Sequence, residues 1–222
     1  TLPGWFYQPQ WIEAPALLPA EANAYLMPLM ILHDESAIAG QVMQDLECRV
    51  NLKISGSITA FAQRGQPWQM MMEPSVHEPL QAVVVITTAQ VCVGTVTAML
   101  QNLVPLLRSP VRLLWMHCEV DAGEEIKNNG ESKNSGQPAH RYVCSALLQS
   151  AAAETALLSV TAIDCCGGIA NAGRYLWQEL CTSTRETTVL YQNGRRWRRA
   201  IVEAALTPAQ ISASLTAPAD RE

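Results

Sequence analysis

Residues Leu80 to Thr87 read LQAVVVIT and decide the fold class. A block of β-branched residues without polar alternation is typical of a strand buried on both faces of a parallel sheet. Apolar residues at helical spacing follow from Val91 to Leu107, and Ser109-Pro110 ends that helix. Val111 to Met116 is the next apolar run of strand length. Because parallel strands need a long crossover connection, this order predicts a parallel sheet with covering helices.

The same alternation is found upstream of this unit. Tyr25 to His33 is an apolar run of strand length, and Asp34-Glu35-Ser36 is a signal that opens a helix. The residues at helical spacing behind that signal are Ile38, Val42, Met43 and Leu46. Cys48 to Ile54 alternates apolar and polar residues, which predicts a half-buried strand.

Downstream, the pattern predicts a helix from Arg141 to Glu154, a strand from Leu157 to Ile163 and a helix from Ile169 to Cys181. Strands and helices therefore alternate along most of the chain. The sequence predicts an α/β fold of the doubly wound kind, with a mainly parallel sheet.

Three segments do not follow this alternation. Trp5 to Ile12 surrounds Pro9, which suits an edge or entering strand because proline donates no hydrogen bond to a sheet. Ser55 to Pro79 has no firm period, and we expect it to be mostly loop. Asp121 to Pro138 is polar and contains two turn signals, so residues 121–138 are predicted to form a mobile insertion.

The segment Thr187 to Val202 predicts a β-hairpin at the end of the fold. Asn193-Gly194 between two β-prone runs favours a two-residue type I′ turn. Such a turn sets the pairs Gln192 with Arg195, Tyr191 with Arg196 and Leu190 with Trp197. Leu190, Trp197 and Ile201 then share one face, and we expect Trp197 to be the apolar anchor of the hairpin.

Composition and charge exclude several classes of protein. The chain has 222 residues, of which 49% are hydrophobic and 16% charged, as in a globular domain. A formal net charge of −5 argues against a nucleic-acid partner. Its apolar runs are shorter than the roughly 18 to 20 residues of a membrane span. Seven cysteines without metal-binding spacing suggest a reduced, cytoplasmic protein. The chain starts at Thr1-Leu2-Pro3, which suggests a piece of a longer polypeptide.

The turns after the predicted strands lack a phosphate-binding loop. His33-Asp34-Glu35 follows the first buried strand, where a nucleotide-binding sheet would carry Gly-x-Gly-x-x-Gly. Two acidic residues at that place repel a phosphate. Gly167-Gly168 and Gly173 have the wrong order for such a loop, and are interpreted as a tight strand-to-helix turn. We therefore predict no cofactor-binding residues.

Two further patterns have a functional and a plain interpretation. Cys165 and Cys166 end a strand where a nucleophile would be plausible, but no histidine lies near in sequence, and the four histidines lack metal-ligand spacing. Buried, unreactive thiols are the plain alternative. The arginines of the hairpin, Arg195, Arg196, Arg198 and Arg199, surround Trp197. They suit a solvated hairpin, or one docked on an acidic neighbour, better than a nucleic-acid site.

The order of these segments resembles the structural subdomain of the ketoreductase in modular polyketide synthases, especially those of the trans-acyltransferase kind. Tyr7, Pro9 and Trp11 match the Tyr-x-Pro-x-Trp strand that opens that subdomain. The segments Val83–Thr88, Val111–Trp115, Tyr142–Glu154 and Leu157–Asp164 resemble it as well. Its closing hairpin is matched by Tyr191, Asn193, Gly194, Arg196, Trp197 and Arg199. The resemblance covers nearly the whole chain.

This resemblance implies that residues 1–222 form a single structural subdomain with a shortened, Rossmann-like fold that binds no cofactor. Catalytic, cofactor-binding and metal-binding residues are then all absent from this chain. NADPH and the catalytic residues are expected in a following catalytic subdomain, which reduces a β-keto group on a carrier-protein thioester. The chain ends at Asp220-Arg221-Glu222, where the family begins its glycine-rich strand.

The expected partners are that catalytic subdomain and neighbouring synthase domains, with no nucleic acid and no membrane. The reductase itself is either active or degenerate. Two alternatives remain open: a freestanding enzyme that uses Cys165 or Cys166 as its nucleophile, and a docking module within a megasynthase.

Overall fold

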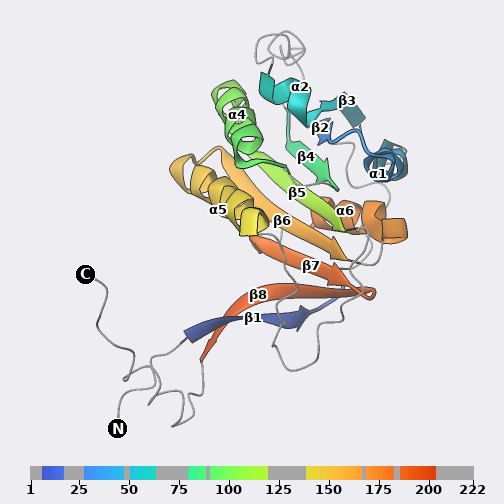
Figure 1. The fold of residues 1–222 in the computed structure, drawn as a ribbon, viewed down its shortest axis with the longest axis vertical. Helices are drawn as coiled ribbons and strands as arrows, with labels where there is room; N and C mark the ends of the chain where they lie inside the picture. The colour runs from blue at the N-terminus through green and yellow to red at the C-terminus, as the bar shows by residue number, and fades with distance from the viewer. Residues whose placement is uncertain are drawn as a thin grey trace, which may run out of the picture.

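The structure is a computed structural model, and it describes residues 7–17, 28–47, 51–63, 80–88, 91–119, 139–166, 169–182 and 186–203. In these ranges the fold is a mixed sheet with helices on both faces (Figure 1). None of the helices in these ranges is both long enough and apolar enough to cross a membrane.

The sheet has eight described strands and two kinds of pairing. In spatial order they are β1 (Tyr7–Ala14), β8 (Arg195–Glu203), β7 (Thr188–Gln192), β6 (Leu158–Cys166), β5 (Val111–Glu119), β4 (Ala82–Thr87), β2 (Pro28–His33) and β3 (Asn51–Ser57). All neighbours from β3 to β7 are parallel, whereas β8 is antiparallel to both β7 and β1. The predicted fold, a Rossmann-like and mainly parallel sheet with a terminal hairpin, is confirmed.

Helices cover both faces, as the doubly wound arrangement requires (Figure 1). One face carries α1 (Ala37–Glu47) and α6 (Ala172–Cys181), which follows the short 3₁₀ turn η2 (Ile169–Asn171). The other face carries α2 (Ile58–Gln63), α4 (Val93–Leu103) and α5 (Ala139–Glu154), with η1 (Val104–Leu106) after α4. Two hydrophobic cores result, one on each side of the sheet.

Strand β4 lies inside the parallel part of the sheet, between β5 and β2, and contributes to both cores. All six of its residues are buried. Val84 and Ile86 belong to the core under α1 and α6, and Val83 and Val85 belong to the core under α4 and α5. Burial of each such side chain contributes roughly 1.5–3 kcal/mol. The unbroken β-branched run of β4 is therefore the sequence signature of its position between two layers of helices.

The prediction that Ser55 to Pro79 is mostly loop is wrong for its first part. Strand β3 continues to Ser57, and α2 follows at once. Ser57 Oγ accepts a hydrogen bond from the Ala60 N–H at the start of α2, whose Ile58 and Phe61 are buried. A helix of six residues is too short to show a period in the sequence. The remainder, 64–79, and the predicted insertion 121–138 lie outside the described residues.

The hairpin has the predicted register. Leu190 pairs with Trp197 and Tyr191 with Arg196, and both turn residues, Asn193 and Gly194, have positive φ values of 52° and 76°. The expected anchor, Trp197, is confirmed only in part. Trp197 is only half-buried and Ile201 is 75% exposed, whereas Arg196 is 4% exposed. The face opposite Trp197 is buried because it meets the end of α6.

Candidate functional site

The strand order places a topological switch point between β2 and β4. The chain passes from β2 to β3 on one side and returns to β4 on the other side of β2. In open α/β sheets, ligands bind outside the carboxyl ends of the strands at such a point. The ends of β2 and β4 are therefore where a nucleotide would be expected.

Asp34, directly after β2, fills this point with its own carboxylate. Asp34 Oδ2 accepts hydrogen bonds from the backbone N–H of Thr88 at 2.5 Å and from Thr88 Oγ1 at 2.9 Å. Asp34 Oδ1 accepts from the Ser36 N–H at 3.1 Å. Partial burial opposes ionisation, but these hydrogen bonds prevail and lower the pKa of Asp34 to about 2. An ionised carboxylate thus accepts hydrogen bonds from backbone N–H groups on both sides of the switch point.

The turn from β2 into α1 is built without glycine. Glu35 has a φ of 63°, a conformation that usually calls for glycine, and its N–H donates to His33 Nδ1 at 3.1 Å. Ser36 Oγ then accepts from the Ala39 N–H and caps α1. The residues of this turn therefore do not fit a dinucleotide phosphate, because side chains and a negative charge stand where the glycine loop would bring bare backbone.

Gly173, the glycine considered for a phosphate loop, has a packing role. A Cβ atom built on Gly173 would lie 2.6 Å from Asp45 Cβ of α1, which is closer than carbon atoms approach in proteins. Glycine at this position lets α6 and α1 pack side by side. Gly167 and Gly168, predicted to form a tight turn, lie outside the described residues.

The structure separates the two candidate nucleophiles. Cys165 and Cys166 at the end of β6 are 1% and 6% exposed. Cys165 lies opposite Cys118 in the register with β5, and its hydrogen bond together with burial raises the pKa of the Cys118 thiol. By strand alternation Cys166 lies on the other face, which it shares with the buried His117. Because reactive thiolates need solvent access, this burial favours the plain interpretation of both cysteines.

The histidines are also dispersed. His117 Nδ1 lies 3.2 Å from Thr87 Oγ1, and His33 takes part in the turn after β2. His77 and the side chain of His140 lie outside the described part of the chain. Within that part, no three His, Cys, Asp or Glu side chains are placed to hold a metal ion.

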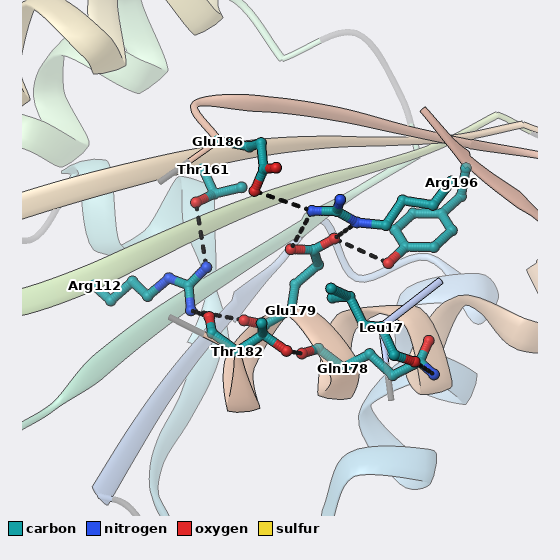
Figure 2. A network of polar contacts seen from close by, with 9 residues as sticks. Leu17, Arg112, Thr161, Gln178, Glu179, Thr182, Glu186 and Arg196 are labelled. Atoms are coloured by element: carbon teal, nitrogen blue, oxygen red, sulfur yellow. Dashed lines mark hydrogen bonds and ion pairs between the residues drawn. The ribbon is translucent and has the colours of Figure 1, made fainter. Parts of the chain in front are cut away.

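A buried polar network lies beneath the hairpin (Figure 2). Arg196 of β8 donates to both oxygens of the Glu179 carboxylate, at 2.7 Å from Nε and 3.3 Å from Nη2. The Tyr191 hydroxyl donates to Glu179 Oε1 at 2.9 Å. The side chains of Arg196 and Glu179 are 3% and 0% exposed. The arginine cluster is thus partly docked on an acidic neighbour, one of the two plain alternatives that the sequence allowed.

The network also fixes the end of α6. Arg112 of β5 donates through Nη1 to the carbonyl oxygens of Glu179 at 2.6 Å and Thr182 at 2.5 Å. Gln178 Nε2 donates to the Leu17 carbonyl beyond β1 (Figure 2). Helix α6 is therefore tied to the central strand β5, to the hairpin and to the segment after β1.

Glu179 and Arg112 were not recognised in the sequence as important residues. A signal exists in each case, because Glu179 stands beside the apolar residues Tyr175, Leu176, Trp177 and Leu180, and Arg112 interrupts the apolar run from Val111 to Met116. Ionisable residues inside apolar runs are rarely buried unless they have partners. The partners of Glu179 and Arg112 are distant in sequence, so the sequence pattern alone does not identify them.

Of the comparisons with known proteins, the one with solved structures supports the fold. No family model matches the chain, and no curated protein matches it. Among solved structures, it is similar to A-type ketoreductases from a modular polyketide synthase, with a TM-score of 0.66 and 13% identity over 90% of this chain and 43% of that one. The chain is also similar to the first ketoreductase of the tylosin polyketide synthase. The TM-score is 0.64, with 13% identity over 91% of this chain and 42% of that one.

A third similar structure contains the adenylation, ketoreductase and pseudo Asub domains of a keto acid-selecting NRPS module. Its TM-score is 0.64, with 12% identity over 92% of this chain and 19% of that chain. At such identities the likeness shows the fold alone. The chain has a ketoreductase-like fold, and it spans less than half the length of these structures.

Proposed function

We propose that this chain is the non-catalytic structural half of a polyketide synthase ketoreductase and that it supports a separate, NADPH-dependent catalytic half. The observation that carries the proposal is the contact between Asp34 and Thr88. Backbone N–H groups at the switch point would have to bind a phosphate, and here those of Thr88 and Ser36 donate to Asp34 instead. An internal carboxylate thus takes the position where a cofactor phosphate would be bound.

The length of the similar structures supports the same proposal. The chain matches 42–45% of several solved ketoreductases and is itself about 90% covered by each match. More than half of each of those proteins therefore lies outside the matched region. We propose that the catalytic half corresponds to this unmatched portion, and that it carries out the reduction of carrier-protein-bound β-keto intermediates.

The ribbon formed by β1 and β8 offers a surface for such a partner. Trp11, Trp197 and Ile201 lie on one face of it, because Trp11 pairs with Arg199 and the three residues follow the alternation of the strands. Ile201 is 75% exposed, and both indoles are half-buried. Interfaces between domains of one chain commonly bury about 600–1,500 Å². We propose that the catalytic half covers this face, which we call the ribbon face.

The test adds this chain to a separately expressed catalytic half from the same synthase. We expect the thermal midpoint and the NADPH-dependent rate of that half to rise, because a partner that binds only the folded state stabilises it. Ile201→Asp should abolish the effect. Val143→Asp is the matched control, since Val143 is an exposed apolar residue (48%) on α5, away from the ribbon.

The chain alone, titrated with NADPH by calorimetry, should show no saturable binding tighter than about 100 μM. Such binding would contradict the proposal directly. If neither the midpoint nor the rate changes at tens of micromolar, with both proteins folded, the structural role is wrong.

The ribbon face also favours a second candidate, a docking module within a megasynthase. Tryptophan and arginine, which are enriched at the centres of protein interfaces, occur together on this face as Trp11, Trp197, Arg195 and Arg199. A measurable affinity for a carrier protein, lost in Ile201→Asp and without effect on a catalytic half, would favour this alternative.

A further inference from the structure

Two cysteines lie on neighbouring elements of the helical layer formed by α4 and α5, which pack side by side (Figure 1). Cys144 of α5 is 5% exposed, and its thiol donates a hydrogen bond to the Val91 carbonyl oxygen at 3.6 Å. Val91 directly precedes Cys92, which is the N-cap residue of α4. Because the Val91 oxygen and the Cys92 sulfur belong to consecutive residues, they are at most about 6 Å apart. The Cys144 sulfur is therefore held beside the residue that carries the second thiol.

Cys92 is the accessible thiol of this pair, and it alone is exposed among the six cysteines that the structure describes. Its Sγ lies 3.1 Å from Thr95 Oγ1 and accepts a hydrogen bond from the Thr95 N–H at 3.4 Å. The hydroxyl of Thr95, together with this N–H, lowers the pKa of the Cys92 thiol. Thiolate character and solvent access are the two properties that make a cysteine react with oxidants.

Cys144 has the opposite properties. Burial raises the pKa of its thiol, and the negative charge of a Cys92 thiolate raises that pKa further. Cys144 is therefore a poor first target for an oxidant, but it is placed to attack an oxidised neighbour. Redox-sensing cysteines often divide the work in this way, with one accessible thiol that is oxidised and a second thiol that resolves the product.

We propose that Cys92 is a site of oxidation by peroxides and that Cys144 resolves the product into a Cys92–Cys144 disulfide. In the first step the Cys92 sulfur attacks hydrogen peroxide, the O–O bond breaks, and the sulfur becomes a sulfenic acid as one water is released. In the second step the Cys144 sulfur attacks the sulfenic acid, which forms the S–S bond and releases a second water. The two thiols lose two protons and two electrons in total, and the peroxide gains them.

The disulfide would tie α4 to α5. Its S–S bond is only about 2.05 Å long, so the Cys92 side chain has to turn away from Thr95 to form it. Because Cys92 is exposed, this rotation meets little packing resistance. The site does not rest on the proposed structural role, because it lies on the helical layer and not on the ribbon face.

The test exposes the full chain to hydrogen peroxide and then blocks the remaining thiols with N-ethylmaleimide. Peptide mass spectrometry should find Cys92 and Cys144 joined, and dithiothreitol should restore both thiols. In Cys144→Ala, dimedone should instead label a sulfenic acid at Cys92, because no thiol remains to resolve it. In Cys92→Ser the crosslink should be lost and Cys144 should stay reduced.

Cys181 is the matched control, because it is a partly exposed cysteine whose pKa is raised by burial to about 11. Cys181→Ser should leave the Cys92–Cys144 crosslink unchanged. In the reduced chain, iodoacetamide at neutral pH should modify Cys92 at least about tenfold faster than Cys181. The proposal is wrong if the folded chain forms no Cys92–Cys144 crosslink or if Cys92 reacts no faster than Cys181. A crosslink from Cys92 to any other cysteine, in the same chain or in a second copy, would overturn the role of Cys144.

Discussion

The two carboxylates at Asp34 and Glu179 are held in different ways. Asp34 is half-buried at the carboxyl ends of the strands and is held by neutral donors of Thr88 and Ser36. Glu179 is fully buried on α6 and is held by the guanidinium of Arg196 and the hydroxyl of Tyr191. Backbone and hydroxyl donors are enough to stabilise a charged carboxylate that water still reaches, whereas a fully buried carboxylate needs a cation as its partner.

The two sites also differ in what they join. Asp34 links the ends of two neighbouring strands, β2 and β4. The network around Glu179 joins α6 to β5 and to the hairpin, and its ionic partner lies 17 residues away. Breaking the first should therefore affect one turn, while breaking the second should loosen the docking of the hairpin on the helical layer. Each prediction below tests one side of this comparison.

The largest effect is expected for the buried pair. Arg196→Met leaves Glu179 charged and buried, and should lower the free energy of unfolding by about 3–5 kcal/mol. The double variant Glu179→Leu with Arg196→Met should recover most of this loss, because no unpaired charge remains. Urea unfolding followed by circular dichroism measures both.

Arg195→Ala is the matched control on the same strand. Arg195 forms an ion pair with Glu13 at 3.5 Å, but the two side chains are 62% and 54% exposed. Exposed pairs of this kind contribute about 0–1 kcal/mol. If Arg196→Met costs no more than Arg195→Ala, the buried network does not hold the hairpin.

A smaller, pH-dependent effect is expected at Asp34. Its pKa is lowered from 3.8 to about 2 in the folded state, so its contribution to stability is complete above pH 4 and is lost as the pH falls towards 2. Because solvent screens part of the interaction, we expect ionised Asp34 to contribute about 1 kcal/mol to the free energy of unfolding. Asp34→Asn should remove this part of the acid dependence of the unfolding free energy. An unchanged dependence between pH 4 and pH 2 would show that Thr88 does not stabilise the ionised form.

Much of the fold could be predicted because its signals are local. The run Val83 to Ile86 shows burial on both faces, and Asn193-Gly194 sets the register of the hairpin through the turn itself. Helix α2 was missed because six residues give no period. The face that Trp197 shares with Leu190 and Ile201 predicts it as the anchor, but burial was decided by what lies opposite each face of the ribbon.

The candidate site was predictable only in part. The sequence at the end of β2 reads His33-Asp34-Glu35 and contains no glycine loop, a property that is local. The contact from Asp34 to Thr88 spans 54 residues, and the contact from Arg112 to the end of α6 spans about 70. Contacts of this range depend on the order of strands in the sheet. The sequence predicted a parallel sheet but did not state that order.

The smallest effects on stability are expected at two glycines. A Cβ at Gly194 or at Gly40 would meet nothing within 4 Å. Neither is limited by packing, so alanine substitutions there measure the effect of backbone conformation alone. Gly194 has a φ of +76°, and alanine there should cost about 1 kcal/mol because an L-residue is strained in this region. Gly40 lies inside α1, where alanine should instead stabilise by about 0.5–1 kcal/mol through its higher helix propensity. Opposite shifts of the thermal midpoint in Gly194→Ala and Gly40→Ala would attribute the difference to the type I′ turn. A stabilising Gly194→Ala would mean that the turn does not hold its left-handed conformation in solution, and the register that docks Arg196 on Glu179 would then need another cause.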